Sequence, residues 1–256
     1  MITAVRMPES AEAAAEAAAR GGRVMAGGTV VMAEVNTGPV DDAELISLRH
    51  AGLSGITVKE GVARVGATTT FTELHNELSF LQEAIRTLAS PTIRNLATVG
   101  GNLFVPQPYG DFAVCLLALD ATVEITGGRE APIDDLTLTP GEIVTAVRFA
   151  VPREGTWFYR KAMRRKLNSA AIVTVAAVVD EDTVRIALGG VAPGPVRSPA
   201  AERVLRGQEL SREVLDAAGE AALADIDPRD DAYASAWYRR RVLPVHVRRA
   251  FENREA

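Results

Sequence analysis

The sequence predicts an α+β protein built of two or three lobes, and three observations lead to this fold class. The chain has 256 residues, enough to bury a sizeable core in more than one lobe. Its first part alternates short apolar strands with helices and is punctuated by paired glycines. Its last part begins with a strongly β-prone run at 170–179, followed by a second strand and surface helices, which is typical of an α+β lobe.

Composition limits the classes of function. Apolar residues make up 47% of the chain and charged residues 24%, as in ordinary globular proteins, and the net charge of −5 argues against general nucleic-acid binding. Cys115 is the only cysteine, so the chain cannot supply four thiolates to an iron–sulfur cluster. The run at 170–179 is too short to span a bilayer, and no signal pattern opens the sequence. We therefore expect a cytoplasmic protein without a membrane span.

Capping and glycine signals predict the elements of the first part. A helix is expected over 8–20, where Ser10 can cap it and Gly21-Gly22 can end it. Short strands are expected at 23–26, 45–48, 56–58, 63–65 and 122–126. Further helices are expected at 29–35, 69–77, 78–88 and 111–119. The second of these has a capping box, with Thr70 followed by Glu73.

The character of the sequence changes near Trp157. A basic run covers 160–166, and the strands at 170–179 and 184–188 are expected to pair across an acidic turn. Surface helices are expected at 199–206 and 211–224, and a basic terminal helix, interrupted by Pro244, at 238–251. A domain boundary is expected at 152–156.

Two glycine segments are the strongest candidates for a binding site. Val24–Thr29 and Ala97–Asn102 each run from apolar residues through paired glycines to a small polar side chain. Consecutive backbone N–H groups can converge on a diphosphate only where no Cβ obstructs the approach and positive φ is available. Thr29, Thr98 and Asn102 can add side-chain donors. Because no G-x-G-x-x-G follows a strand and no P-loop is present, a dinucleotide would need another architecture.

The chain resembles the flavoprotein (medium) subunits of the xanthine dehydrogenase and carbon monoxide dehydrogenase family. Ala26-Gly27-Gly28-Thr29 is similar to the family's first FAD loop, and the run from Ile93 to Leu103, which contains Thr98-Val99-Gly100-Gly101-Asn102, is similar to its second. Pro108-Tyr109-Gly110-Asp111 and the run from Ala187 to Pro193 follow in the family's order.

The resemblance implies an FAD-binding fold of two α/β subdomains (PCMH-type, vanillyl-alcohol-oxidase-like) over 1–53 and 54–153. A C-terminal α+β domain is implied over 154–256. It implies that the two loops wrap the FAD diphosphate, that Asp111 bonds the ribityl region, and that Lys161 lies near the isoalloxazine. Val144, or Ile143 on an equally fair alignment, would make a backbone contact to the ring. The implied FAD-binding residues are Arg23, Val24, Met25, Ala26, Gly27, Gly28, Thr29, Val30, Thr98, Val99, Gly100, Gly101, Asn102, Asp111, Val144 and Lys161.

The resemblance also implies a function and partners. A molybdenum-cofactor large subunit would oxidise the substrate, and a small subunit with two [2Fe–2S] clusters would relay single electrons. FAD in this chain would pass them to NAD⁺, a quinone or O₂, within an (αβγ)₂ heterohexamer. The protein would bind and tune the cofactor, so no residue of this chain is predicted to be a catalyst or a metal ligand.

Departures from the family pattern leave two other functions open. The connection from Ile133 to Glu142 looks short, which favours a free-standing FAD-dependent oxidoreductase. Val30 and Gln107 replace an acidic and a hydroxyl residue, which favours a non-enzymatic scaffold that has lost FAD.

Individual residues also have plainer interpretations. Asp111 opens a helix, where a carboxylate is favourable in itself. Lys161 lies in a basic run of the kind that usually forms a solvated face.

Overall fold

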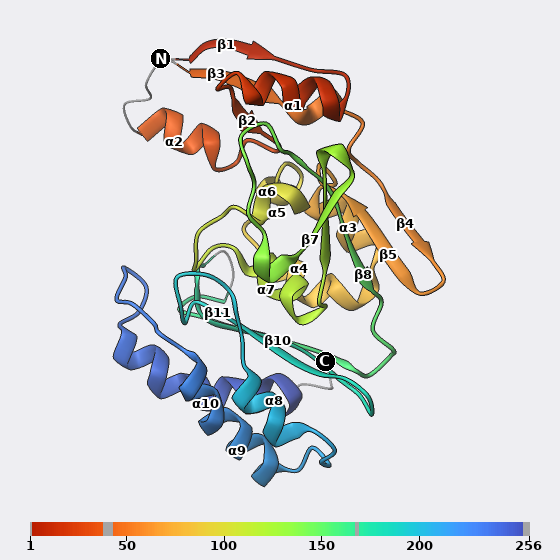
Figure 1. Cartoon of the computed structure of the whole chain (residues 1–256). Helices are drawn as coiled ribbons and strands as arrows, with labels where there is room; N and C mark the ends of the chain where they lie inside the picture. Colours follow the sequence, from red (N-terminus) through yellow and green to blue (C-terminus); the bar gives the residue numbers. More distant parts are fainter. Residues whose placement is uncertain (1, 38–42, 167–168, 253–256) are drawn as a thin grey trace. The chain divides into compact units, whose positions relative to one another are not determined.

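The computed structural model describes residues 2–37, 43–166 and 169–252 (Figure 1). These residues form two compact units, and the chain passes between them more than once. The N-terminal unit comprises Met1–Ser79, Ser90–Val105 and Ala121–Ala150, and the C-terminal unit comprises Phe80–Ala89, Pro106–Asp120 and Val151–Ala256.

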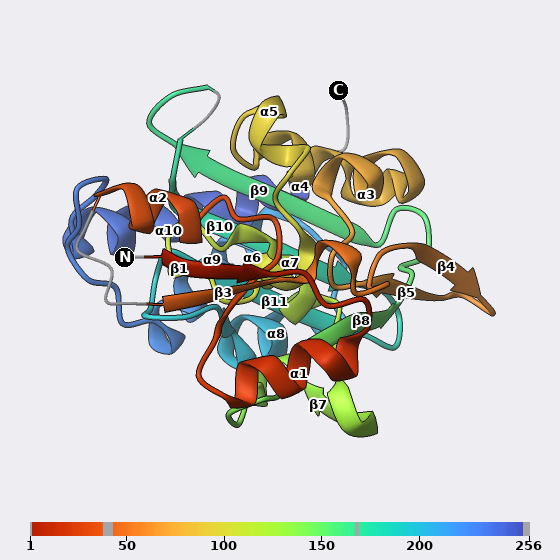
Figure 2. The ribbon, with the colours of Figure 1, turned by 90° about the horizontal axis from the view of Figure 1, so that it is seen from above.

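A small parallel sheet and two helices form the first lobe of the N-terminal unit. The strand order is β1 (Ile2–Arg6), β3 (Ala43–Ser47) and β2 (Arg23–Met25), and both pairings are parallel. Helix α1 (Ala11–Ala19) packs on β3, beside which it runs in Figure 2. Helix α2 (Val31–Thr37) follows β2. These elements confirm the helices expected at 8–20 and 29–35, whereas β1 was not predicted.

The start and end of α1 follow from single residues. The Ser10 hydroxyl accepts a hydrogen bond from the Ala13 N–H at 3.1 Å, which satisfies a backbone donor that the first turn leaves unpaired. Gly21 has a φ of +96°, a conformation that glycine adopts without steric cost, so the chain turns sharply after α1. Ala14 and Ala17 face inward and pack against Ile46 of β3.

An antiparallel five-stranded sheet forms the second lobe of the N-terminal unit. Its order is β4 (Ile56–Lys59), β5 (Val62–Gly66), β8 (Val144–Ala150), β6 (Thr122–Ile125) and β7 (Arg129–Pro132). Helices α3 (Phe71–Glu77), α5 (Pro91–Arg94) and α6 (Val99–Asn102) belong to the same lobe, and α6 packs on β5 and β8. The capping box of Thr70 and Glu73 is present as predicted. Strands β7 and β8 and helices α5 and α6 were not predicted.

A four-stranded antiparallel sheet organises the C-terminal unit. Its order is β12 (Val196–Arg197), β11 (Val184–Gly189), β10 (Ala171–Val179) and β9 (Trp157–Met163), and β10 pairs with β11 as predicted. Helices α7 (Asp111–Ala118) and α10 (Ala236–Glu252) both contact β10. Covered by helices, β10 is buried along almost its whole length, which explains why its sequence is a continuous apolar run rather than an alternating one.

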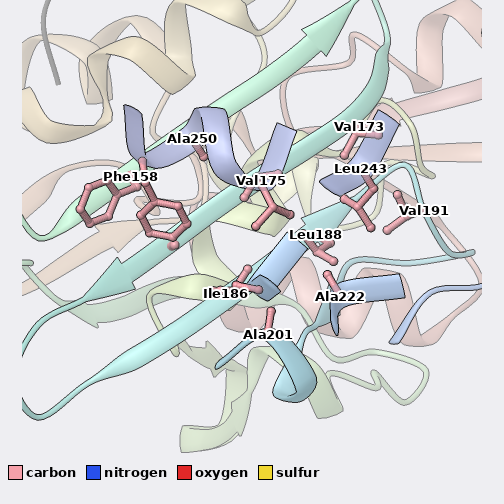
Figure 3. Close-up of a cluster of buried hydrophobic side chains, with 14 of the residues drawn as sticks. Phe158, Val173, Val175, Ile186, Leu188, Val191, Ala201, Ala222, Leu243 and Ala250 are labelled. Carbon is pink, nitrogen blue, oxygen red and sulfur yellow. The ribbon is translucent and has the colours of Figure 1, made fainter. Parts of the chain in front are cut away.

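Helices close the remaining surface of this sheet. Helix α4 (Gln82–Thr87) contacts β9, and the short 3₁₀ helix η2 (Ser79–Leu81) directly precedes it. Helices α8 (Pro199–Leu205) and α9 (Arg212–Ala221), followed by η5 (Ala222–Asp225), pack together with α10. Figure 3 shows Leu243 and Ala250 of α10 meeting apolar side chains of the sheet. In the part of the chain that the structure describes, no helix is long and apolar enough to cross a membrane.

The contact between α9 and α10 depends on one glycine. A Cβ at Gly219 would lie 2.6 Å from the Pro244 carbonyl oxygen and 2.8 Å from its Cα, so a side chain would force the helices apart. Gly194, in contrast, has open space around its Cβ position.

We expect Gly219→Val to lower the free energy of unfolding by at least about 2 kcal/mol, because overpacking against rigid backbone is not relieved by a rotamer change. Gly194→Val is the control, and it should lie within about 0.5 kcal/mol of the parent protein, as most surface substitutions do. Urea denaturation measures both. Equal losses for the two variants would contradict this packing.

Candidate functional site

A cavity of about 370 Å³ lies in the N-terminal unit, where the two glycine segments and the start of β8 meet. It brings together most of the residues predicted to bind FAD. Those that line it are Arg23, Val24, Ala26, Gly27, Gly28, Thr29, Val30, Thr98, Gly100, Gly101, Asn102 and Val144. Met25 of β2 and Val99, which is fully buried in its lobe, do not line it.

The first glycine segment turns the chain from β2 into α2. Gly28 has a φ of +72°, and its carbonyl accepts the Met32 N–H at 2.9 Å, which starts the helix. Gly27 has a different role, because a Cβ there would overlap the carbonyl group of Leu96 in the second segment. The lack of a side chain at Gly27 therefore allows the two lobes to touch backbone to backbone.

The second glycine segment is tied to the five-stranded lobe by backbone hydrogen bonds. The Thr98 hydroxyl caps α6 by accepting the Gly101 N–H at 3.2 Å. The Gly100 N–H donates to the Ala67 carbonyl at 2.8 Å, and a Cβ at Gly100 would lie only 2.7 Å from the Ala67 Cβ. Gly101 is open by comparison, since its Cβ would meet only the Thr98 hydroxyl at 3.0 Å and the Ala26 Cβ at 3.7 Å.

These contacts correct part of the sequence interpretation. Positive φ was expected to be the reason for the glycines in both segments, but only Gly28 uses it. Gly27 and Gly100 are required by close packing within the protein. Gly101 is the position where the absence of a side chain leaves space at the cavity.

Charge in the cavity is unevenly distributed. Among the described residues that line it, Arg23 is the only cation, and Glu34 and Glu142 are the carboxylates. Arg23 forms an ion pair with Glu34. Glu142 accepts hydrogen bonds from Arg129 and from the Thr139 N–H, which lower its pKa to about 2, so it stays ionised.

Asp111 and Lys161 lie in the C-terminal unit, where they form a buried ion pair. Lys161 Nζ lies 2.8 Å from Asp111 Oδ2, and both side chains are at most 3% exposed. Lys161 also donates to the Thr87 carbonyl at 3.1 Å, and the Thr174 hydroxyl donates to Asp111 Oδ1 at 2.5 Å. Burial raises the pKa of Asp111, and Lys161 and Thr174 offset part of that rise.

The solvated-face interpretation of Lys161 is therefore wrong. Residues 160–163 belong to β9, which pairs with β10, and the strand carries Lys161 into the interior of its unit. The run Trp157–Met163 carries no regular alternation of apolar and polar residues, so no local signal revealed this strand. Asp111 does open α7 as expected, yet its recorded side-chain partners are Lys161 and Thr174.

Two other residues with chemically active side chains, Cys115 and Tyr109, are held by contacts within the protein. Cys115 is buried, and burial raises the pKa of its thiol. Tyr109 packs edge-on against Tyr233 with ring centroids 5.7 Å apart and shares a hydrogen bond with it. Within residues 2–37, 43–166 and 169–252, no cluster of three His, Cys, Asp or Glu side chains could hold a metal ion.

Gln107, one of the departures from the family pattern, has a structural role. Its Oε1 accepts the Gly190 N–H at 2.9 Å, and its Nε2 donates to the Gly110 carbonyl at 3.1 Å. The amide side chain thus ties together two loops of the C-terminal unit. Its presence gives no support to a loss of cofactor binding.

Comparison with known proteins decides the family. Residues 2–152 match the FAD binding domain in molybdopterin dehydrogenase, and residues 157–254 match the CO dehydrogenase flavoprotein C-terminal domain. The chain belongs to the FAD-binding subunits of the molybdopterin dehydrogenases. Its cofactor is FAD and its class is that of oxidoreductase subunits, as the resemblance implied.

Relatives of this FAD-binding subunit cover nearly its whole length. It is 31% identical over 252 residues to a putative xanthine dehydrogenase FAD-binding subunit of Escherichia coli K12, covering 89% of this chain and 86% of the relative. It is 30% identical over 256 residues to the carbon monoxide dehydrogenase medium chain of Afipia carboxidovorans, covering 91% and 89%.

Solved structures confirm the predicted fold class. A chain of the carbon monoxide dehydrogenase of Hydrogenophaga pseudoflava aligns with a TM-score of 0.90 at 26% identity, covering 98% of this chain and 96% of that one. A chain of a Cu,Mo-CO dehydrogenase aligns with the same TM-score at 28% identity, covering 98% of both. The FAD-binding subunit is thus an α+β protein with an FAD-binding fold and a C-terminal domain.

The buried pair makes a testable contribution to stability. We expect Lys161→Met to lower the free energy of unfolding of the FAD-free subunit by about 3–5 kcal/mol, because it leaves the Asp111 carboxylate buried without its cation. Asp111→Asn should also destabilise the subunit. The double variant should lose less than the sum of the single losses, by more than about 1 kcal/mol.

Denaturation of the four proteins in a double-mutant cycle measures this coupling. Strictly additive losses would show that Asp111 and Lys161 do not depend on each other.

Proposed function

We propose that FAD binds in the cavity of the N-terminal unit, with its diphosphate against the segments 26–29 and 98–102. The chemistry of the lining residues supports this position. Thr29 and Asn102 offer side-chain donors, and bare glycine backbone at Gly28 and Gly101 allows a phosphate to approach closely. The place of Gly101 in the cavity lining is the observation that carries the assignment, because a Cβ there would meet only two side-chain atoms and no backbone of the protein.

Arg23 is proposed to form an ion pair with the diphosphate. It is the only cation among the described cavity-lining residues, and its ion pair with Glu34 is at the surface, where such pairs contribute little. A diphosphate can therefore replace Glu34 as the partner of the Arg23 guanidinium at little cost in free energy.

The contacts of Asp111 and Lys161 to the ribityl chain and the flavin ring are part of the same proposal. Lys161 has three N–H donors, and Asp111 and Thr87 engage two of them in the described part of the chain. With FAD bound, Lys161 would hold a positive charge beside the flavin ring and would stabilise negative charge on it. Val144 lines the cavity and supports the backbone contact suggested for that position, as does its neighbour Ile143.

We further propose that the subunit accepts electrons from the [2Fe–2S] clusters of a small subunit and passes them to NAD⁺, a quinone or O₂. When bound, the flavin supplies chemistry that takes up electrons singly and releases them singly or as a pair. This chain's own part is to bind and orient the cofactor and hold charge beside it. Its single cysteine means that the clusters have to come from another chain.

The names of the relatives support a multi-subunit assembly. They include medium chains of carbon monoxide dehydrogenases and a subunit of a 6-hydroxypseudooxynicotine dehydrogenase complex. We propose a molybdenum-cofactor large subunit and a [2Fe–2S] small subunit as partners, in an (αβγ)₂ heterohexamer. A division into 1–53, 54–153 and 154–256 and a cytoplasmic location, which suits the free thiol of Cys115, complete the proposal.

The diphosphate position is tested by Gly101→Asp. The new carboxylate adds bulk and negative charge at the cavity, so FAD affinity should fall at least about a hundredfold, equivalent to 2.7 kcal/mol or more. Flavin fluorescence titration of the FAD-free protein measures the affinity, and circular dichroism checks that the fold is kept. Gly194→Asp, an addition at an open position, should bind FAD like the parent.

Gly100→Asp is unsuitable for this test, because its Cβ would collide with Ala67 and confuse unfolding with loss of binding. Unchanged FAD affinity in Gly101→Asp would place the diphosphate elsewhere.

Co-purification tests the assembly. When the tagged subunit is expressed together with its neighbouring genes, iron, molybdenum and two further chains should co-purify with it. A flavin-containing protein that is isolated alone and turns over a small molecule by itself would instead favour the free-standing oxidoreductase.

A further inference from the structure

The segment 138–144 forms one wall of the cavity and bridges the two lobes of the N-terminal unit. Leu138, Glu142, Ile143 and Val144 all line the cavity. The segment includes the end of the short connection between Ile133 and Glu142. The sequence alone did not indicate how this connection affects the cofactor. Its contacts to both lobes decide what it can do.

On the side of the first lobe, the segment is anchored by Ile143 and Gly141. Ile143 is 3% exposed and packs in the buried cluster with Ala14 and Ile46. Gly141 has a φ of +91°, and a Cβ there would lie 2.9 Å from the Ala19 Cβ, so the chain passes directly against α1. The wall is therefore packed against the first lobe.

On the side of the second lobe, the segment is held by the hairpin of β6 and β7. The Ile143 N–H donates to the Thr126 hydroxyl at 3.0 Å, and the Thr126 N–H donates to the Ile143 carbonyl at 2.9 Å. Val144 then begins β8 in the five-stranded sheet. The wall thus spans the junction on which the shape of the cavity depends.

An ion pair joins Glu142, which lines the cavity, to Arg129, which does not. Arg129, on β7, donates from Nε to Glu142 Oε1 at 2.7 Å and from Nη2 to Glu142 Oε2 at 2.9 Å. Nη2 also donates to the Thr137 carbonyl at 2.7 Å, and the Thr139 N–H donates to Glu142 Oε2 at 2.7 Å. A bidentate pair of this geometry fixes orientation as well as distance, and here it fixes the loop 137–142.

We infer that the pair of Arg129 and Glu142 is a clamp that preorganises the cavity wall 138–144, which makes Arg129 a positioning residue for FAD although it does not line the cavity. This inference rests on the proposed binding of FAD in the cavity. Without the clamp, the loop gains conformational freedom, and this freedom is lost again when the cofactor binds. The entropy cost lowers the affinity for the cofactor. Because both side chains are partly exposed, the pair contributes little to global stability.

The same sheet provides a matched control. Arg64 of β5 and Glu124 of β6 form an ion pair in which Arg64 Nε lies 3.1 and 2.9 Å from the two carboxylate oxygens and Nη2 lies 2.7 Å from Oε2, with side chains 49% and 18% exposed. The corresponding values for Arg129 and Glu142 are 40% and 19%. Neither Arg64 nor Glu124 lines the cavity. The two pairs therefore differ in whether they hold the cavity wall.

The test compares Arg129→Met, Arg129→Lys and Arg64→Met in the full chain. Flavin fluorescence on the FAD-free protein should show a Kd about tenfold higher for Arg129→Met, mainly through faster dissociation, since loop ordering is lost. Arg129→Lys keeps the charge but not the bidentate geometry and should lie in between. Arg64→Met should bind FAD like the parent, and all three variants should unfold at similar urea concentrations.

Amide hydrogen exchange of the FAD-free chain provides a second readout. Exchange over 138–144 should be faster in Arg129→Met than in the parent, and unchanged in Arg64→Met. If Gly101→Asp binds FAD normally while this exchange difference is present, the cavity assignment fails and the clamp stands. If Arg129→Met matches Arg64→Met in both affinity and exchange, the clamp is wrong.

Discussion

The binding site depends on a backbone contact between two segments that are far apart in the sequence. Gly27 lies so close to the Leu96 carbonyl that no side chain fits between them, and Gly100 is pressed against Ala67 in the same way. The contact of Gly27 with Leu96 joins the parallel three-stranded lobe to the antiparallel five-stranded lobe, and the contact of Gly100 with Ala67 holds the second glycine segment within the five-stranded lobe. The cavity is the space that remains beside the contact, bounded by Thr29, Asn102 and the start of β8.

Rigid elements hold the candidate site, and paired charged side chains lie at its margin. One glycine segment is fixed by the start of α2 and the other by hydrogen bonds to the loop around Ala67, so the donors of the cavity are placed before a cofactor arrives. Carboxylates at the margin are each paired with an arginine, which limits their repulsion of a diphosphate. The C-terminal unit adds a pair of opposite charges, Asp111 and Lys161, that is buried rather than screened by water. This division suits a protein that holds and tunes a redox cofactor and leaves substrate chemistry to another chain.

Local signals predicted the elements that depend on local chemistry. Ser10 caps α1, Thr70 and Glu73 form the capping box of α3, and the apolar run of β10 pairs with β11. The glycine segments were found from their composition and from the family resemblance. Elements whose sequence carries no strong period, such as β1, β8 and β9, were missed, because partners distant in the sequence decide whether they form strands.

The same limit applies within the site. The reason for each glycine became visible only once Leu96 and Ala67 were placed beside them, and no pattern in the sequence indicates such a contact. The charge of Lys161 suggested exposure, but its place in β9 decided otherwise. Glu142 was overlooked although it directly precedes Ile143 and Val144, because its carboxylate matters through Arg129, which is 13 residues away. Sequence therefore identified the cofactor and most of the residues that line the cavity, but not the contacts that shape the cavity.

A crystal structure of the chain reconstituted with FAD tests the central claim most directly. The account predicts electron density for the diphosphate between residues 26–29 and 98–102, with Arg23 turned from Glu34 toward a phosphate oxygen. Density for the diphosphate at another surface, or a cavity filled by side chains of the protein itself, would contradict it.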